Sequence, residues 1–454
     1  MLGKTSLRRG GALAGAVIAV SLFATACTPS TPDPVSPPPS DDAYNEYPSI
    51  LTDEFAGSSI SFWGWDSLEF NKPIEDYVLA KAGVTTNSRQ VSSDGYFDQL
   101  RLAAQSGTLP DVFKAQNSKD LPQIVEIGAA RDITELVEPF REYLSDASWE
   151  ACTWEGRVYC LPANSPAAGM FYRDDILQEY GIDASTLTTW EAYIDAAKKL
   201  SSESDGANFL LGSSKSIETD YLLPGILGVS HAELLNSDLE VQVSPDSEEW
   251  QTALSIIREL TADGVGKDYE MWTPPWYEAI KDGSLASYPI GTWFPQTILQ
   301  QAPDNLGVWN FQPFPAVEEG GDRYVSLGSA IILLSPTTSN EGAAFELAKA
   351  WSIDPQGAIG IGLEELGISV VTTPALESEF VNQPDPLFAN EQPYWRDATE
   401  AYVNITWQPD ANIANNQALS ILTTNLPAFL EGQSADEFLT KLANDLRQQI
   451  RGAS

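Results

Sequence analysis

The side chains that most often do chemistry are scarce or unpaired in this sequence. It contains one histidine, His231, which has no HxxxH or HxxE partner. This excludes most histidine-dependent catalytic triads and nearly all histidine-based metal sites. The 64 Asp and Glu residues could include a glycosidase pair, but no spacing singles out two of them. We therefore expect no metal, no cofactor and no enzymatic activity, and we look for binding chemistry instead.

Binding chemistry is expected where strands end. An apolar run at residues 59–63 predicts a buried strand, and further strands are expected at 84–91 and 111–113. They alternate with helical patterns at 72–82, 96–104 and 121–130, which predicts an α/β fold with a parallel sheet. Ligands of such sheets lie beyond the carboxyl ends of the strands. The candidate residues at these ends are Trp63, Trp65, Asp66, Gln116 and Asn117. For the tryptophans the alternative is core packing, and for the polar residues it is capping or loop hydrogen bonding.

The first 27 residues predict where the protein works. Lys4, Arg8 and Arg9 precede an uncharged apolar run that is too short for a comfortable membrane span, and Ala24-Thr25-Ala26-Cys27 resembles a bacterial lipobox. We expect residues 1–26 to be a lipoprotein signal peptide and Cys27 to carry the lipid; the alternative is a secreted protein in which Cys27 is incidental. Residues 27–45 then form a proline-rich disordered tether, which would hold the body near the extracellular face of the membrane.

Cys152 and Cys160 remain, in the segment ACTWEGRVYC. An exported compartment permits disulfides, and a hairpin that turns near Glu155-Gly156 could bring the pair together. A three-residue loop centred on Gly156 would place the cysteines opposite each other, whereas a two-residue loop would not. We expect a disulfide that stabilises a local hairpin.

Length and charge restrict the partners. The chain has 454 residues, more than one hydrophobic core usually spans, so we expect at least two lobes. Its net charge of −39 repels nucleic acid and anionic headgroups. We expect no nucleic-acid partner, a membrane contact only through the Cys27 lipid, and a monomer; acidity itself serves solubility.

Several motifs together resemble the family 1 extracellular solute-binding proteins, the sugar-capturing lipoproteins of ABC importers. Residues 157–162 (RVYCLP), 170–177 (MFYRDDIL) and 189–191 (TWE) follow one another as in that family, and Gly107-Thr-Leu-Pro-Asp-Val112 and Tyr288-Pro-Ile-Gly-Thr-Trp293 fall in its order. The resemblance spans roughly residues 55–450. It implies a type II periplasmic-binding-protein-like fold with two discontinuous α/β lobes, a multi-strand hinge and a ligand cleft between the lobes. The expected lobes are 46–163 with 325–352, and 165–324 with 375–454, with chain crossings near 160–170, 322–332 and 352–375.

The resemblance also adds site residues. Trp293, Trp395 and Tyr221 match aromatic positions of the maltodextrin binders, where ring faces cover the C–H patches of a sugar. Asn164 is a further polar candidate, for which loop hydrogen bonding is at least as good an explanation. Trp272 and Trp276 are interpreted as packing residues of the second lobe, with contact to the ligand as the alternative. Thr292 replaces the usual proline before Trp293. The second acidic or basic group that some maltodextrin binders use after the first strand is not obvious, because Trp65 occupies that neighbourhood, which weakens maltose as the ligand.

The predicted function is capture of a carbohydrate in the cleft, with an oligosaccharide as the expected ligand, and its delivery to ABC permease subunits on separate chains. Two alternatives remain: a surface hydrolase with a carboxylate pair in the cleft, and a protein of the same fold that binds a non-sugar solute such as a polyamine. The aromatic walls and net charge of −39 would suit a cationic ligand.

Overall fold

A computed structural model describes residues 48–92, 95–115, 120–213, 217–369 and 371–452. The predicted signal peptide, Cys27 and the predicted tether lie outside the described residues, as do Gln116 and Asn117. Within the described residues, no helix is long and apolar enough to cross a membrane.

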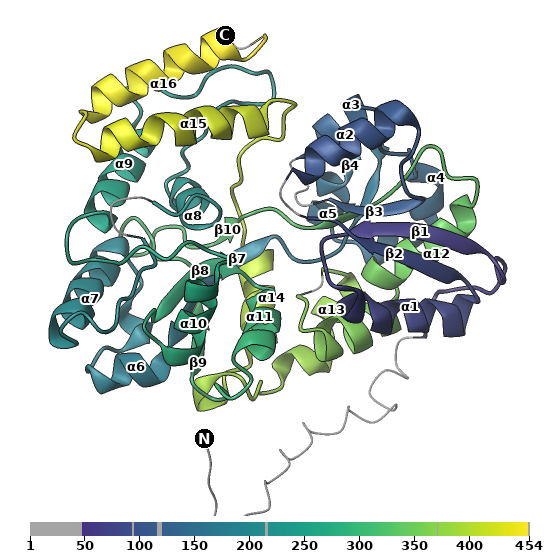
Figure 1. The fold of residues 1–454 in the computed structure, drawn as a ribbon, viewed down its shortest axis with the longest axis horizontal. Coiled ribbons are helices and arrows are strands. Elements are labelled where there is room, and N and C mark those ends of the chain that lie inside the picture. The colour runs from purple at the N-terminus through teal and green to yellow at the C-terminus, as the bar shows by residue number, and fades with distance from the viewer. Residues whose placement is uncertain (1–47, 93–94, 116–119, 214–216, 370, 453–454) are drawn as a thin grey trace, which may run out of the picture. The chain divides into compact units, whose positions relative to one another are not determined.

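The first sheet has five strands in the order β2-β1-β3-β11-β6 (Figure 1). Its strands are β1 (Ser59–Gly64), β2 (Thr85–Gln90), β3 (Val112–Ala115), β6 (Cys160–Pro162) and β11 (Ile331–Leu334). β1 pairs in parallel with β2 and β3, as the alternation of strands and helices predicted, whereas β11 runs antiparallel to both β3 and β6. Asp111, at the start of β3, accepts hydrogen bonds from the Ser61 backbone amide (2.8 Å) and from Thr338 Oγ1 (2.6 Å), so the proline-aspartate motif fixes three segments at one point.

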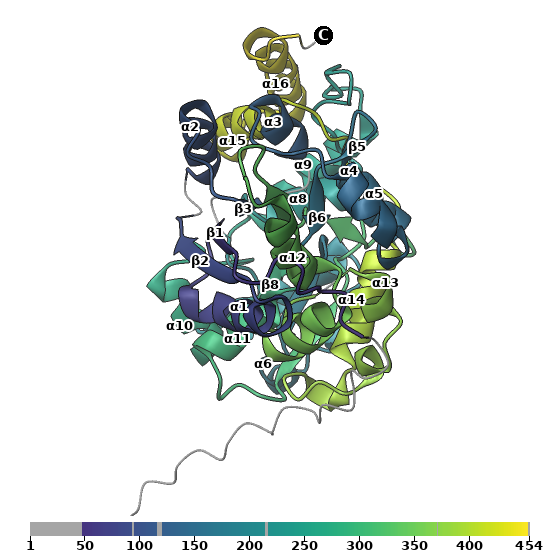
Figure 2. The same cartoon turned by 90° about the vertical axis from the view of Figure 1, so that its right-hand side faces the viewer.

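The helices that cover this sheet come from an early and a late part of the chain. They are α1 (Leu68–Ala82), α2 (Tyr96–Ser106), α3 (Leu121–Glu126), α4 (Thr134–Val137), η2 (Glu138–Tyr143), α5 (Asp146–Ala151) and α12 (Glu341–Ser352). α1 begins four residues before the predicted start because Ser67 caps it, accepting a hydrogen bond from the Phe70 amide. α12 packs beside α1 although more than 250 residues separate them (about 260; Figure 2). The first sheet therefore needs a late segment of the chain to complete its core.

The segment just before β1 is held on α12 by buried charges, and we call residues Ser49–Thr52 the N-terminal strap. Asp354 accepts from the Ile50 amide (2.6 Å) and from Ser49 Oγ (2.8 Å), and Glu346 accepts from the Thr52 amide (3.0 Å). Lys349 forms a buried ion pair with Glu346 (2.9 Å) and donates to the Ile50 carbonyl (3.0 Å). Because these charges are desolvated, each requires its partners. The strap is thus an integral part of the first-sheet core.

A disulfide joins Cys152 and Cys160, but the hairpin between them differs from the expected one. β4 (Thr153–Trp154) and β5 (Arg157–Val158) pair through a two-residue loop, Glu155-Gly156, both with positive φ. As expected for a two-residue loop, the cysteines are not opposite each other: the Tyr159 amide donates to the Cys152 carbonyl (3.0 Å). Cys152 ends α5 and Cys160 begins β6, so both cysteines lie outside the ladder and are not bound by its register.

The second sheet is built around β7 (Ala167–Arg173). β7 pairs with β8 (Ser287–Gly291), β9 (Trp309–Gln312) and β10 (Val325–Ser326), all antiparallel. Every residue of β7 is buried. Met170 and Tyr172 face one hydrophobic cluster, whereas Phe171 faces another, so both sides of this sheet are covered.

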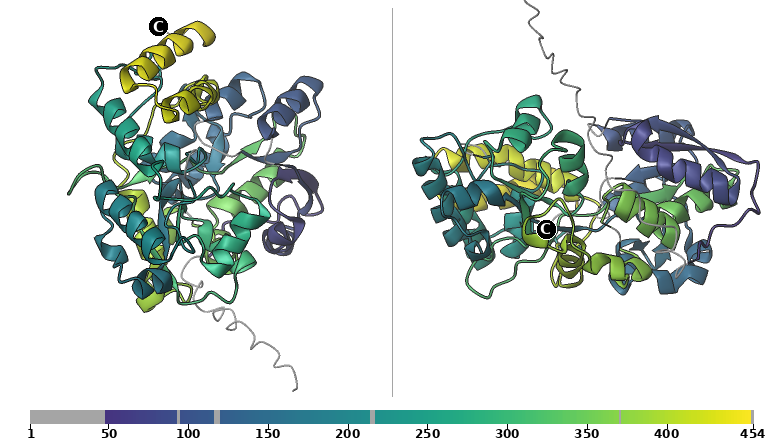
Figure 3. Two further views of the ribbon diagram at one scale, coloured as in Figure 1. Left: turned by 60° about the vertical axis from the view of Figure 1, so that its left-hand side comes forward. Right: turned by 90° about the horizontal axis from the view of Figure 1, so that it is seen from below.

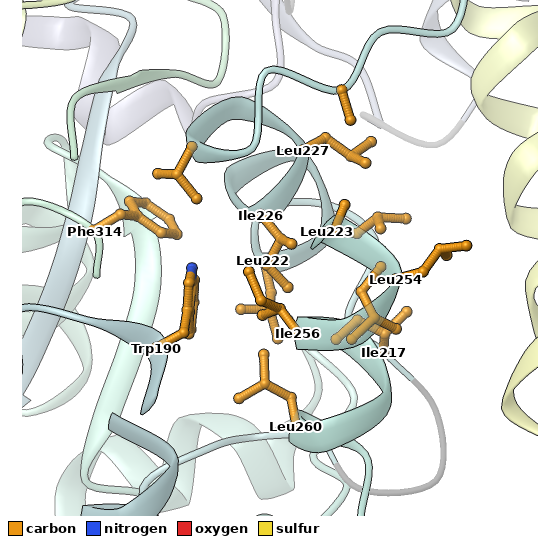
Figure 4. Packing of buried hydrophobic residues seen from close by; sticks show 14 of the residues in the cluster. Trp190, Ile217, Leu222, Leu223, Ile226, Leu227, Leu254, Ile256, Leu260 and Phe314 are labelled. Carbon is orange, nitrogen blue, oxygen red and sulfur yellow. The ribbon is translucent and has the colours of Figure 1, made fainter. Parts of the chain in front are cut away.

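Most of the remaining elements pack around the second sheet, and two of them also contact helices beside the first sheet. The remaining elements are α6 (Asp174–Glu179), η3 (Ala184–Thr186), α7 (Trp190–Glu203), α8 (Leu222–Val229), α9 (Glu248–Leu260), α10 (Pro274–Asp282), α11 (Phe294–Gln301), η4 (Gln356–Glu365), α13 (Thr373–Leu376), η5 (Glu379–Asn382), η6 (Ala389–Glu391), α14 (Tyr394–Val403), α15 (Asn415–Leu430) and α16 (Ala435–Gln449). The two C-terminal helices, α15 and α16, pack against each other (Figure 3). In the larger cluster, Trp190 lies near Phe314 and the leucine and isoleucine side chains of α8 and α9 (Figure 4). The threonine-tryptophan-glutamate motif therefore starts α7 and fills the core.

Three segments connect the sheets. Residues 163–166 link β6 to β7, and residues 327–330 link β10 back to β11. The two links are bonded to each other, from the Ala163 amide to the Ala330 carbonyl (2.8 Å) and from the Leu327 amide to the Pro166 carbonyl (3.0 Å). The third connection follows α12 through η4, a π-helix whose residues contribute to clusters of both sheets.

Candidate functional site

Three aromatic rings from separate parts of the sequence meet beside the second sheet. Tyr221 lies edge-on to Trp293, with ring centroids 5.9 Å apart, and edge-on to Trp272 at 6.3 Å. Trp272 and Trp293 stack at 5.9 Å with their planes 23° apart. We call Tyr221, Trp272 and Trp293 the aromatic cluster. Such a surface can cover the apolar face of a ring-shaped ligand.

Trp293 is positioned by the end of β8 and the start of α11. The Thr292 amide donates to the Ala167 carbonyl (3.0 Å), and the Thr292 carbonyl accepts from the Tyr394 hydroxyl (2.5 Å). A Cβ on Gly291 would lie 2.4 Å from the indole Nε1 of Trp293, so only glycine allows the ring to lie where it does. The substitution of Thr for the usual proline thus leaves Trp293 firmly supported.

Tyr221 is positioned by a buried carboxylate. Glu218 accepts hydrogen bonds from the backbone amides of Tyr221 (3.0 Å) and Leu222 (2.7 Å), and from that of Asp220, at the start of α8. Amides at a helix start favour an anion, but burial dominates and raises the pKa of Glu218 to about 7. Nothing in the sequence singles out Glu218, because its role depends on its contacts with the backbone amides at the start of α8.

Trp272 is the member of the cluster that the sequence interpretation assigned to packing. It is 40% exposed, and its backbone has a φ of 64°, a left-handed value that is unusual for a large side chain. Its neighbour Trp276 is only 2% exposed and does pack in the core. The sequence signal was Thr273-Pro274-Pro275, which starts α10 and leaves Trp272 in the preceding loop.

Trp395 occupies a different environment from the cluster. It is 6% exposed and packs edge-on against Tyr394, with centroids 4.7 Å apart. It also forms a side-chain hydrogen bond with Asp385. In this structure its ring is therefore engaged in the core, and little of its face is open to a ligand.

The first-sheet candidates gather around a buried lysine. Lys114, on β3, pairs with Asp66 at 2.6 Å, and both side chains are largely buried. Its ammonium group also lies 5.5 Å from the Trp65 ring centroid. Trp63 is not part of this group, since it lies under the guanidinium of Arg89 at 5.0 Å. The sequence interpretation missed Lys114, which lies inside a strand rather than beyond its end.

Asn164 joins the two connecting links. Its Oδ1 accepts a hydrogen bond from the Ala330 amide at 2.7 Å. This is the loop hydrogen bond that was named as the alternative to ligand binding for Asn164. Its position, between the two sheets, makes it part of the connection itself.

The described residues form no group of three or more His, Cys, Asp or Glu side chains that could hold a metal ion. A cavity lies beside the aromatic cluster, within the second-sheet body. Its lining includes Glu218, Met271, Trp276 and Tyr288. The hydroxyl of Tyr288 is buried without a hydrogen-bond partner.

Two α/β sheets joined by paired crossing segments define a protein of the type II periplasmic-binding-protein class. Solved structures share this fold. The binding protein from B. animalis subsp. lactis Bl-04 in complex with beta-1,6-galactobiose superposes with a TM-score of 0.74 at 19% identity, covering 87% of this chain and 99% of that one. A maltose-bound protein of T. maritima gives 0.68 at 16% identity, covering 87% and 100%.

The chain belongs to the bacterial extracellular solute-binding protein family, whose model matches residues 65–355. Curated relatives are distant. The lactose-binding protein of Rhizobium radiobacter is 24% identical over 427 residues, which cover 88% of this chain and 94% of the relative. The arabinooligosaccharide-binding protein of Halalkalibacterium halodurans is 25% identical over 305 residues, covering 65% of this chain and 64% of the relative.

Proposed function

We propose that the protein captures a carbohydrate between its two sheets and delivers it to an ABC importer. The observation that carries this proposal is the aromatic cluster, whose three rings converge from distant positions in a member of a solute-binding family. Aromatic faces with nearby polar groups suit the alternating C–H and hydroxyl surface of a sugar. Relatives named for lactose and arabinooligosaccharide support the same ligand class.

Capture in this proposal is a closing motion and involves no bond breaking. The proposed lobes are residues 46–163 with 325–352, and residues 165–324 with 375–454, except that Val325 and Ser326 pair with β7 and therefore lie with the second sheet. The crossing segments would act as the hinge, and Trp65, Asp66 and Lys114 would face the aromatic cluster across the cleft. Trp63 and Trp395 are retained as weaker ligand candidates, together with Asn164 at the hinge and Gln116 and Asn117.

The cellular arrangement is part of the proposal. The family supports an extracellular or periplasmic location. We propose in addition that Cys27 is lipid-modified and that the protein works as a monomer, tethered to the outer face of the membrane beside its permease subunits. Palmitate labelling in cells tests the anchor, because Cys27→Ser should abolish the label and release the protein into the medium.

Differential scanning fluorimetry with mono- and oligosaccharides tests the function. A ligand at 100 times its Kd stabilises the folded protein by about 2.7 kcal/mol, which gives a clear upward shift in Tm. A shift with a sugar that remains intact supports capture. A shift with polyamines alone would show that the ligand is a polyamine and not a sugar. Release of reducing ends would contradict a purely binding role.

A further inference from the structure

We infer that Trp272 is a specificity-determining residue that provides a stacking surface for an additional sugar ring, and therefore that the site selects oligosaccharides over single sugars. This inference rests on the proposed carbohydrate function. It assigns a ligand role to a residue that the sequence interpretation placed in the core.

The first observation is exposure. Among the described residues, Trp272 is the only tryptophan that ranks with the exposed large hydrophobic side chains. A solvent-exposed indole forgoes a large part of the free energy that burial would supply. Trp276, four residues later, shows that the same loop and helix can bury an indole fully. The exposure of Trp272 is therefore a property of its position and not of a poorly packed region.

The second observation is backbone conformation. The φ of 64° at Trp272 places a bulky residue in the left-handed region, which costs about 1–3 kcal/mol and tends to persist at functional positions. Glycine would adopt this conformation without strain. Exposure and strain thus fall on the same residue, and both are unfavourable for stability alone.

The third observation is the order of the rings. Each ring of the aromatic cluster contacts the other two, but Tyr221 and Trp293 are partly buried whereas Trp272 is exposed, so Trp272 is the outermost ring. Trp272 stacks on Trp293 with nearly parallel planes and is supported from the core side by Trp276, with centroids 5.0 Å apart. Trp272 therefore lies at the exposed edge of the aromatic cluster. A ligand with one sugar ring would stack on Trp293, and a longer ligand would also reach Trp272.

Isothermal titration with a homologous series of oligosaccharides, from one to five rings, tests the inference. The wild-type affinity should rise with length, and Trp272→Ala should weaken the longer ligands by roughly 3- to 10-fold while leaving the shortest binding ligand unchanged. Trp272→Phe should restore most of the loss because it keeps a ring. Trp293→Ala should weaken every length.

Trp149→Ala is the matched control, since Trp149 is a partly buried tryptophan stacked under Arg141 beside the first sheet. It should change no affinity. Equal weakening of all lengths by Trp272→Ala, or no weakening of any, would overturn the inference. A wild-type protein that binds no sugar would contradict the proposed carbohydrate function itself. A wild type that binds sugars with no length-dependent effect of Trp272→Ala would contradict only the role of Trp272. Trp272→Gly relieves the backbone strain and replaces the alanine variant should that variant not fold.

Discussion

The tryptophan side chains of the second-sheet body differ in how fully they are buried. Trp293 and Trp276 illustrate this difference, because they belong to the same hydrophobic cluster but differ in burial. Trp293 rests on Gly291 with part of its ring open, whereas Trp276 is enclosed. Their removal should therefore have opposite signatures.

We expect Trp293→Ala to abolish the ligand-induced rise in Tm while changing the ligand-free stability by no more than about 1 kcal/mol. Trp276→Ala should instead cost about 3–5 kcal/mol, because it leaves a large cavity in the core. Scanning fluorimetry with and without sugar measures both. A large loss of ligand-free stability in Trp293→Ala would assign that residue to the core.

Glu364 should make stability depend on pH. It lies on η4, and burial raises its pKa to about 7, from an ordinary value of 4.5. Its Oε1 is buried without a hydrogen-bond partner. Because the folded-state pKa is the higher one, the protonated carboxyl contributes stability that is fully present below pH 4.5 and is lost as pH rises through 7.

We therefore expect Glu364→Gln to unfold at a higher Tm than the wild type at pH 8 and to show less decline between pH 5 and pH 8. The neighbouring Glu365 is exposed, so Glu365→Gln serves as the matched control and should follow the wild-type profile. An unchanged pH profile in Glu364→Gln would show that its carboxyl is solvated in solution. Glu218 acts in the same direction, so part of the wild-type decline should remain.

At the scale of elements, local patterns predicted well and register predicted poorly. The β1, β2 and β3 strands and the helices between them follow from the local sequence patterns and from glycine or serine boundaries. The antiparallel placement of β11 beside β3 did not follow, because the partner lies more than 200 residues away (about 220). The cysteine hairpin shows the same limit, since the cysteines bridge just outside the two-residue loop and ladder.

The Cys152–Cys160 disulfide should stabilise the protein without affecting binding. The cysteines are 8 residues apart in sequence, and closing so short a loop restricts the unfolded chain by roughly 2–3 kcal/mol. Cys152→Ser with Cys160→Ser should lower the free energy of unfolding by about that amount, measured by urea denaturation. Reductant should have the same effect on the wild type and none on the double variant, and a loss of sugar affinity would contradict a purely structural role.

The candidate site was only partly predictable for a related reason. Trp293 and Tyr221 were found because motifs surround them, but whether an indole is exposed depends on neighbours that meet it in three dimensions. Trp272 and Trp395 were therefore interpreted in ways that their burial does not favour: the first is exposed, and the second is enclosed. Lys114 and Glu218 were missed because a buried charge has no signature in sequence apart from its partners.

At the scale of the whole molecule, three segments connect the two sheets within the described residues: the hydrogen-bonded segments 163–166 and 327–330, and the π-helix η4. Closure in this architecture should occur with little change inside either sheet. Small-angle X-ray scattering should show a smaller radius of gyration with a saturating oligosaccharide than without it. Trp293→Ala, which should not bind, provides the control. An unchanged radius on saturation of the wild type would contradict a hinge mechanism.

The N-terminal strap has a mechanical consequence. Residues 49–52 are fastened to α12 by Glu346, Lys349 and Asp354, and Asp354 also accepts from the Gly357 amide at the start of η4. A load applied at residue 48 therefore enters the first-sheet core directly and bypasses the paired links at 163–166 and 327–330. Because Asp354 contacts both the strap and the start of η4, a pull on the leading chain should be shared between the first-sheet core and this third connection.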